Sequence, residues 1–218
     1  MQARKWQDGV SERAGTLAKL ARRLKALSPW PQSSLPALWF LTDEGRPLDP
    51  VAAARALPPG SGIVLRHYRH AARGNLAKEL AGIARERGLT LLIGADARLA
   101  RDIGAHGVHL PQWAIKRRAA PKAHGLLTLS AHSARELQEA HRMRPDAVFL
   151  APVFVTQSHE GAQALGAVRF SALVHKNAFP VIGLGGITPA TAMRLIGSGA
   201  YGIGAIGALL PPTDEISG

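Results

Sequence analysis

The sequence predicts an α/β protein of one domain, a (β/α)8 TIM barrel with an extra basic N-terminal helix. Short apolar runs recur eight times, and helical patterns separate them. The runs lack the alternation of half-exposed strands, which is typical of parallel strands covered on both faces. Eight strand–helix units in about 180 residues fit a compact barrel. A doubly wound open sheet is the alternative.

The expected strands and helix ends recur along the chain at regular intervals. The strands are Ala37–Thr42, Gly62–His67, Thr90–Gly94, Gly107–Leu110, Leu126–Ser130, Ala147–Ala151, Pro180–Leu184 and Gly202–Ile206. Helix starts are marked by Asp49-Pro50, by Thr188-Pro189 and by a capping box at Ser133 and Glu136. Helix ends are expected at Gly88, Gly104 and Gly199.

An additional helix is expected ahead of the barrel. Residues 11–27 place Leu17, Leu20, Leu24 and Leu27 on one stripe, with most basic side chains off it. We therefore divide the chain into a basic amphipathic helix with its connector over residues 1–34 and the barrel over residues 35–218. Such a helix can pack on the domain, or it can lie on a membrane or on RNA. Packing on the domain is the interpretation we favour.

Composition excludes several classes of protein. Among 218 residues there are 27 lysines and arginines, 15 aspartates and glutamates, and no cysteine. Disulfide scaffolds, thiolate zinc sites and cysteine nucleophiles are therefore excluded. No apolar run approaches the roughly 20 residues of a membrane-spanning helix, and the N-terminus lacks the apolar stretch of a secretory signal. We expect a cytoplasmic protein without membrane contacts.

The net charge of +12 raises the question of nucleic-acid binding. The first 30 residues carry seven basic and two acidic residues, so much of the excess belongs to the extra helix. Aromatic residues make up only 5% of the chain and are not interleaved with basic ones, as a stacking platform for single strands would require. We do not expect nucleic acid as a partner.

Two glycine-rich segments point to a phosphate site. Residues 183–188 follow the seventh expected strand, and residues 202–207 form the eighth. Glycines allow backbone N–H groups to approach an anion closely. In TIM barrels the loops after these two strands often hold phosphate. The sequence therefore predicts a phosphorylated ligand.

Five segments, read in order, resemble one family. They are GAHGVHL (104–110), LSAHS (129–133), APVFVTQS (151–158), GLGGITPATA (183–192) and GAYGIGAIGALL (199–210). They are similar to the thiamine phosphate synthase family, which includes the TenI-type thiazole tautomerases. The resemblance runs from Leu38 to Leu210 and implies a thiazole phosphate ligand and a role in thiamine biosynthesis.

The resemblance implies one of two activities. Synthases join hydroxymethylpyrimidine diphosphate to thiazole phosphate and release pyrophosphate with Mg²⁺. The tautomerase relatives isomerise the thiazole by acid–base chemistry and need no metal. The implied partners are small phosphorylated thiazoles and pyrimidines, and Mg²⁺ is a cofactor only if the synthase reaction is retained.

The positions that hold Mg²⁺ in synthases lack carboxylates here. Where the third strand of a synthase ends in Asn-Asp, this chain has Gly94 and Ala95, with Asp96 displaced by one residue. After the fourth strand, the family's Gly-Gln-x-Asp is replaced by Pro-Gln-Trp-Ala, which ends at Ala114. Mg²⁺ usually takes one or two carboxylates. We therefore expect no metal ligands, unless Asp96 replaces them through a shifted loop.

The second strand carries another departure from the family pattern. The family's Gln-x-Arg-x-Lys is here Val64-Leu-Arg-His-Tyr68. A period of two puts Arg66 and Tyr68 on one face of the strand. We expect Arg66 to clamp a phosphate and count it among the catalytic candidates. Tyr68, which is neutral, replaces the lysine that would reach a diphosphate.

The remaining candidates are carried over residue by residue. Those that fit contacts with the thiazole or its phosphate are Ser130, Thr156, Ser158, Gly185, Gly186, Ile206 and Gly207. His132 and His159 are the catalytic candidates for proton transfer, because imidazole takes and gives protons near neutral pH. His159 stands where the family has lysine. His67 is also suited to proton transfer, whereas His109 is expected to be a hydrogen-bonding core residue.

The sequence thus predicts a thiamine-biosynthesis enzyme that resembles thiamine phosphate synthase but has lost its Mg²⁺-binding carboxylates. A metal-independent tautomerase that uses His132 or His159 is one alternative. A non-catalytic phospholigand-binding or regulatory protein is another. The oligomeric state is left open.

Overall fold

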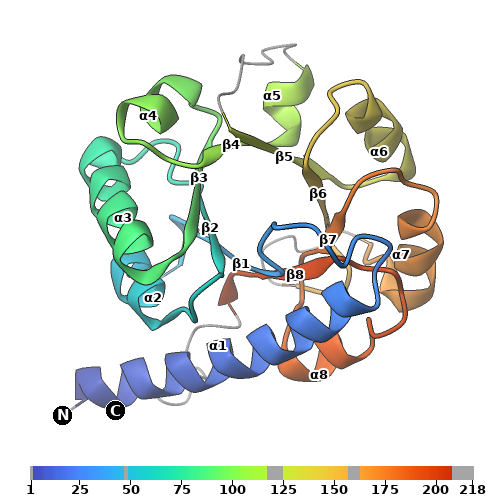
Figure 1. The fold of residues 1–218 in the computed structure, drawn as a ribbon, viewed down its shortest axis with the longest axis horizontal. Coiled ribbons are helices and arrows are strands. Elements are labelled where there is room, and N and C mark those ends of the chain that lie inside the picture. Colours follow the sequence, from blue (N-terminus) through green and yellow to red (C-terminus); the bar gives the residue numbers. More distant parts are fainter. Residues whose placement is uncertain (1, 47–48, 117–124, 157–162, 208–218) are drawn as a thin grey trace.

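The computed structural model describes residues 2–46, 49–116, 125–156 and 163–207 and shows a closed parallel barrel (Figure 1). The strands are β1 (Leu38–Leu41), β2 (Gly62–Leu65), β3 (Thr90–Gly94), β4 (Gly107–Leu110), β5 (Leu126–Ala131), β6 (Ala147–Leu150), β7 (Val181–Gly183) and β8 (Gly202–Ala205). Neighbouring strands pair in sequence order, and β8 pairs with β1. The predicted barrel is confirmed, and the open sheet is excluded.

Helices surround the barrel (Figure 1). They are α1 (Gln2–Ala26), α2 (Pro50–Ala56), α3 (Arg73–Arg87), α4 (Ala97–Asp102), α5 (Gln112–Lys116), α6 (Ala134–His141), α7 (Gly166–Val174) and α8 (Pro189–Met193). The side chains of Asp49 and Thr188 cap α2 and α8 as predicted. Ser133 caps α6, but the carboxylate of Glu136 accepts the backbone N–H of His132. Helix α8 ends well before Gly199.

Helix α1 packs along the outside of the barrel. It contacts β1 and β8 as well as α2 and α8, and Figure 1 shows it running past these elements. Its buried face carries Val10, Ala14, Leu17, Ala21 and Leu24, at the spacing of three and four residues that one helical face requires. The expectation that the helix packs its leucines on the domain is therefore confirmed.

The predicted start of this helix was wrong, whereas its predicted end is correct to within one residue. Helix α1 begins at Gln2 rather than near residue 11, and it ends at Ala26. Leu27 directly follows the last helical residue and is 56% exposed, so it does not belong to the buried stripe. Lys19, Arg22 and Arg23 are exposed to solvent. None of the described helices combines the length and the apolar character that crossing a membrane requires.

A cluster of buried side chains fills the inside of the barrel and closes one end of it. Trp39, Phe149 and Tyr201 are fully buried, and the rings of Trp39 and Phe149 meet edge to face. The Tyr201 hydroxyl donates to the carbonyl of Leu35, in the segment that precedes β1. Because Tyr201 immediately precedes β8, this contact lies at the amino ends of the strands. The carboxyl ends remain available for a site, as in other TIM barrels.

We expect the burial of α1 to contribute measurably to stability. Replacing Leu17, which is fully buried, by Ala should lower the free energy of unfolding by about 2–5 kcal/mol, because it leaves a cavity. The matched change Leu27→Ala should cost less than about 0.5 kcal/mol, because that side chain is exposed. Urea denaturation would measure both, and equal effects would contradict this packing.

Candidate functional site

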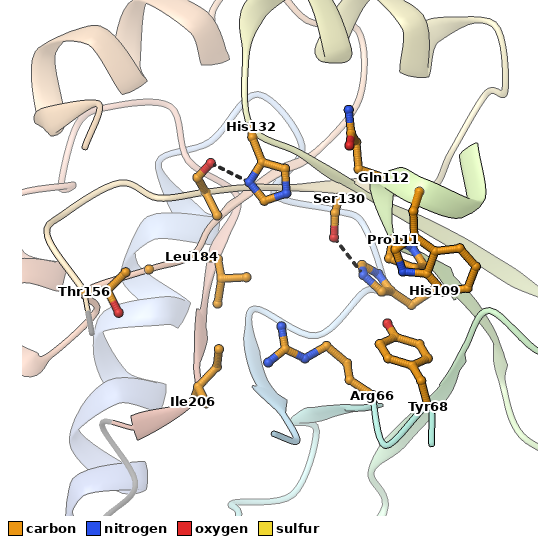
Figure 2. Close-up of a pocket in the computed structure, with 13 residues that line it drawn as sticks. Arg66, Tyr68, His109, Pro111, Gln112, Ser130, His132, Thr156, Leu184 and Ile206 are labelled. Atoms are coloured by element: carbon orange, nitrogen blue, oxygen red, sulfur yellow. Dashed lines mark hydrogen bonds between the residues drawn. The ribbon is translucent and has the colours of Figure 1, made fainter. Parts of the chain in front are cut away.

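Two adjoining pockets lie at the carboxyl ends of the strands. The first, of about 270 Å³, is shown in Figure 2 and is lined by Arg66, Tyr68, His109, Pro111, Gln112, Trp113, Ser130, His132, Ala151, Thr156, Leu184, Gly185 and Ile206. The second, of about 240 Å³, is lined by Arg46, Val155, Thr156, Leu184, Gly185, Gly186, Ile187, Thr188, Gly204, Ala205, Ile206 and Gly207. The pockets share four residues, so one ligand can extend from one into the other.

Arg66 is held at the edge of the first pocket by the residues that follow β1. Its Nε donates to the carbonyl of Thr42 at 2.9 Å, and its backbone N–H donates to the Thr42 hydroxyl at 2.9 Å. One terminal nitrogen lies 3.6 Å from Oδ2 of Asp43. Burial lowers the pKa of Arg66, while Tyr68 and Asp43 act in the opposite direction. In Figure 2 the guanidinium points into the pocket, where it can meet an anion.

Tyr68 lies beside Arg66 on the pocket side of the chain, as the period of two predicts. Its ring meets Trp113 edge to face and packs against Gly94, where a Cβ would lie 2.8 Å from the tyrosine ring. Its hydroxyl is buried without a hydrogen-bond partner among the described residues. Burial raises the pKa of Tyr68, so the side chain stays neutral at physiological pH. Tyr68 and Trp113 therefore form an aromatic wall.

His109 and Ser130 form the floor of the first pocket. Both ring nitrogens of His109 bond to hydroxyls, Nδ1 to Thr128 and Nε2 to Ser130, each at 2.9 Å. Figure 2 shows the bond to Ser130. The ring also meets Phe149 edge to face. Burial is the main cause that lowers the pKa of His109 to about 3, with a smaller effect from Arg66. The imidazole is therefore neutral and structural, which agrees with the expected core role.

His132 is held at the opposite side of the pocket by two contacts. Its Nδ1 lies 3.0 Å from the carbonyl oxygen of Ala151, and its backbone N–H donates to Glu136 at 2.7 Å. The other carboxylate oxygen of Glu136 accepts from the side chain of Gln112. Because a carbonyl can only accept, Nδ1 carries the proton, and in the neutral ring Nε2 is the unprotonated nitrogen. Nε2 thus belongs to a ring that lines the pocket.

The glycine turn after β7 requires the absence of side chains. Gly185 and Gly186 have φ values of +90° and +64°, in the left-handed region that favours glycine. A Cβ on Gly186 would lie 2.5 Å from the carbonyl oxygen of Val155, and one on Gly185 would lie 2.9 Å from Pro152. The turn is thus pressed against the loop after β6. Its backbone forms part of the surface of the second pocket.

Most predicted site residues are brought together at these pockets. Arg66, Ser130 and His132 line the first, Gly186 and Gly207 line the second, and Thr156, Gly185 and Ile206 line both. Ser158 and His159 lie outside the described residues. His67 lines neither pocket; it is buried, and its Nδ1 lies 2.8 Å from the Thr42 hydroxyl.

Sequence reasoning missed several lining residues. Arg46 lines the second pocket from a loop, and Gln112 and Trp113 line the first from the start of the five-residue helix α5, which is too short for a periodic pattern to indicate the direction of a side chain. The position of Asp43 and Arg46 just after a predicted strand was the available signal, because such positions form the site of a TIM barrel.

Asp96 is engaged by partners outside the two pockets. Its Oδ1 caps α4 by accepting the N–H of Leu99 at 2.9 Å, and its Oδ2 pairs with Arg73 at 3.2 Å. Asp96 is not among the residues that line either pocket. Within the described ranges, no cluster of three or more His, Cys, Asp or Glu side chains could hold a metal ion.

The fold and the site define a TIM-barrel protein with paired pockets at the carboxyl ends of its strands. The family model described as "Thiamine monophosphate synthase" matches residues 40–209. The chain therefore belongs to the thiamine monophosphate synthase family. Membership in this family supports a role in thiamine biosynthesis.

Individual relatives agree with this assignment. A thiamine-phosphate synthase of Bacillus velezensis is 30% identical over 178 residues, which cover 76% of this chain and 79% of the relative. A putative thiamine-phosphate synthase 2 of Aquifex aeolicus is 33% identical over 62% of this chain and 74% of its own length. The structure of a thiamine phosphate pyrophosphorylase from Pyrococcus furiosus has a TM-score of 0.66 at 22% identity, over 84% of this chain and 90% of that chain. The last comparison supports the fold.

The buried His109 gives the protein a specific dependence on pH. Its pKa of about 3 lies below the value of about 6.5 in an unfolded chain, so between these values the unfolded state binds more protons. Stability should therefore fall as the pH is lowered from 6.5 towards 3. In His109→Gln the slope of unfolding free energy against pH should decrease by up to about 1.4 kcal/mol per pH unit.

Urea denaturation at several pH values would measure this slope. The change His175→Gln, at an exposed position after α7, is the matched control, because His175 is not buried and lines neither pocket. His67 is also buried, and burial lowers its pKa, so a weaker pH dependence should remain in His109→Gln. An unaltered slope in this variant would contradict the buried, neutral state of His109.

Proposed function

We propose that this protein is a thiamine-biosynthesis enzyme that binds a thiazole phosphate across the two pockets and acts on it by metal-independent acid–base chemistry. The observation that carries this proposal is the charge of the site. Arginines line both pockets, and no carboxylate is found among the described residues that line them. A site of this composition favours a phosphorylated ligand without a bridging divalent ion.

The division of the ligand between the pockets follows from their chemistry. The glycine-rich second pocket exposes backbone near Arg46 and suits the phosphate. The first pocket offers the aromatic rings of Tyr68 and Trp113 together with Ser130 and His132, which suits a small heteroaromatic ring. Thr156 lines both pockets and is placed to contact the ligand where the two meet.

Mg²⁺, which the synthase reaction uses, does not fit the residues described here. Gly94 and Ala95 supply no carboxylate, Ala114 is buried, and Asp96 is engaged by Arg73 and by the start of α4. Tyr68 also occupies the space in front of Gly94. Ala95 has a φ of +54°, an uncommon conformation for alanine, which places only a methyl group at this turn. We therefore derive no step through a metal-bound diphosphate.

His132 is the residue that we assign to proton transfer. With its Nδ1–H donating to Ala151, Nε2 can accept a proton from a ring carbon of the thiazole precursor. The same imidazolium can return a proton to a second ligand position, so the reaction is an isomerisation without net gain or loss of protons. The backbone contact with Glu136 holds the start of this loop in place.

The replacement of His132 tests this assignment. In His132→Gln, isomerisation of the thiazole phosphate precursor should slow by about 10²- to 10⁴-fold, whereas the dissociation constant for thiazole phosphate should change only a few-fold. The reaction is followed by the ultraviolet absorbance of the aromatic product, with EDTA present. His175→Gln serves as the control, because His175 is exposed and lines neither pocket.

Three outcomes would contradict this function. Formation of thiamine phosphate from the two phosphorylated substrates only when Mg²⁺ is added would identify a synthase. Unchanged isomerisation in a variant that lacks both His132 and His159 would overturn the acid–base assignment. Tight binding of thiazole phosphate without turnover by the wild-type protein would indicate a non-catalytic binding protein.

A further inference from the structure

The second pocket receives its charge from an unexpected part of the chain. Arg46, in the loop after β1, is the one charged side chain among the described residues that line this pocket. Its side chain is mostly buried, at 19% exposure. It reaches the pocket because β1 pairs with β8, which brings the loop after β1 next to Ile206 and Gly207. A cation is thus placed beside the glycine-rich surface.

Asp43 fixes the position of this arginine. Its Oδ2 lies 3.6 Å from Nε of Arg46 and 3.6 Å from a terminal nitrogen of Arg66. Its Oδ1 accepts the backbone N–H of Gly45 at 3.1 Å, which shapes the turn between the two residues. One carboxylate therefore contacts two guanidiniums that line different pockets. The group of three side chains retains one net positive charge.

Gly207 provides the space that Arg46 occupies. A Cβ at position 207 would lie 2.7 Å from a terminal nitrogen of Arg46, closer than such atoms approach in proteins. The φ of Gly207 is not in the left-handed region, so its backbone conformation alone does not require glycine. A Cβ there would instead displace the flexible end of the Arg46 side chain. The guanidinium and the glycine therefore form one structural unit at the edge of the pocket.

We infer that Arg46 binds the phosphoryl group of the ligand in the second pocket, and that the absence of a side chain at Gly207 leaves its guanidinium in the binding position. This inference rests on the proposed function for the identity of the ligand. Arginine presents two parallel N–H donors that match two phosphate oxygens, and its charge persists at any physiological pH. The site thereby selects a phosphorylated ligand over the corresponding alcohol.

Binding of a matched pair of ligands tests the role of Arg46. Thiazole phosphate and the dephosphorylated thiazole alcohol are titrated into the wild-type protein and into Arg46→Ala by calorimetry. The variant should bind thiazole phosphate roughly tenfold to a hundredfold more weakly, because it loses a charge-assisted contact. Its affinity for the alcohol should remain within about threefold of the wild-type value. Arg98→Ala, which removes an arginine that is 89% exposed on α4, is the control.

The dependence on Gly207 is tested by combining two substitutions. Gly207→Ala should weaken binding of thiazole phosphate in the wild-type background, because its methyl group displaces the guanidinium. The same substitution in Arg46→Ala should have no further effect, since no guanidinium remains to be displaced. Additive effects of the two substitutions would overturn the inferred unit. A thermal melt of each variant confirms that it is folded.

Titration with inorganic phosphate separates this inference from the proposed function. Arg46-dependent binding of inorganic phosphate, together with no binding of thiazole phosphate, would support the role of Arg46 and refute the proposed ligand. Binding of both compounds that is equally strong in Arg46→Ala would overturn the inference and leave the proposed ligand intact. Failure of the wild-type protein to bind either compound would refute both.

Discussion

The pairing of β1 with β8 is the contact on which the rest of the structure depends. It closes the barrel, and it requires Gly202, because a Cβ there would collide with the carbonyl of Ala37. Helix α1 covers this seam from outside, and the segment before β1 seals the barrel beneath it. At the carboxyl end, the same closure brings Arg46 to Gly207. The pairing of β1 with β8 therefore contributes to stability and also determines which residues line the second pocket.

The sequence predicted the strands well, because apolar runs that are buried on both faces leave a strong local signal. The common orientation of Arg66 and Tyr68 was also predictable, since it follows from the period of a strand. The bounds of helix α1 were harder to predict from the sequence. Its buried face is made of small residues such as Ala14 and Ala21 as much as of leucines, so the leucine stripe misplaced its start.

The contacts of the site depend on tertiary structure, so local sequence patterns do not predict them. Arg46 and Gly207 are separated by most of the chain and meet only when the barrel closes. Glu136 was expected to complete a helix cap, but its carboxylate bonds to Gln112 and to the backbone of His132. These contacts of Glu136 with the residues around the site replace the local contact of a capping box. No spacing rule could have indicated which partner Glu136 takes.

Direct contacts couple the residues around positions 94–96, which the resemblance aligns with part of the family's metal site. Tyr68 fits because Gly94 has no Cβ, and a larger side chain at position 94 would press on the ring and on the carbonyl of Leu65. Arg73 donates to the Gly94 carbonyl and to Asp96, which holds the nearest carboxylate against α4. The resemblance places the family's two carboxylates at positions 95 and 114, on the turn after β3 and in α5. A lysine at position 68 alone would therefore supply no carboxylate, and Asp96 would have to be released by Arg73.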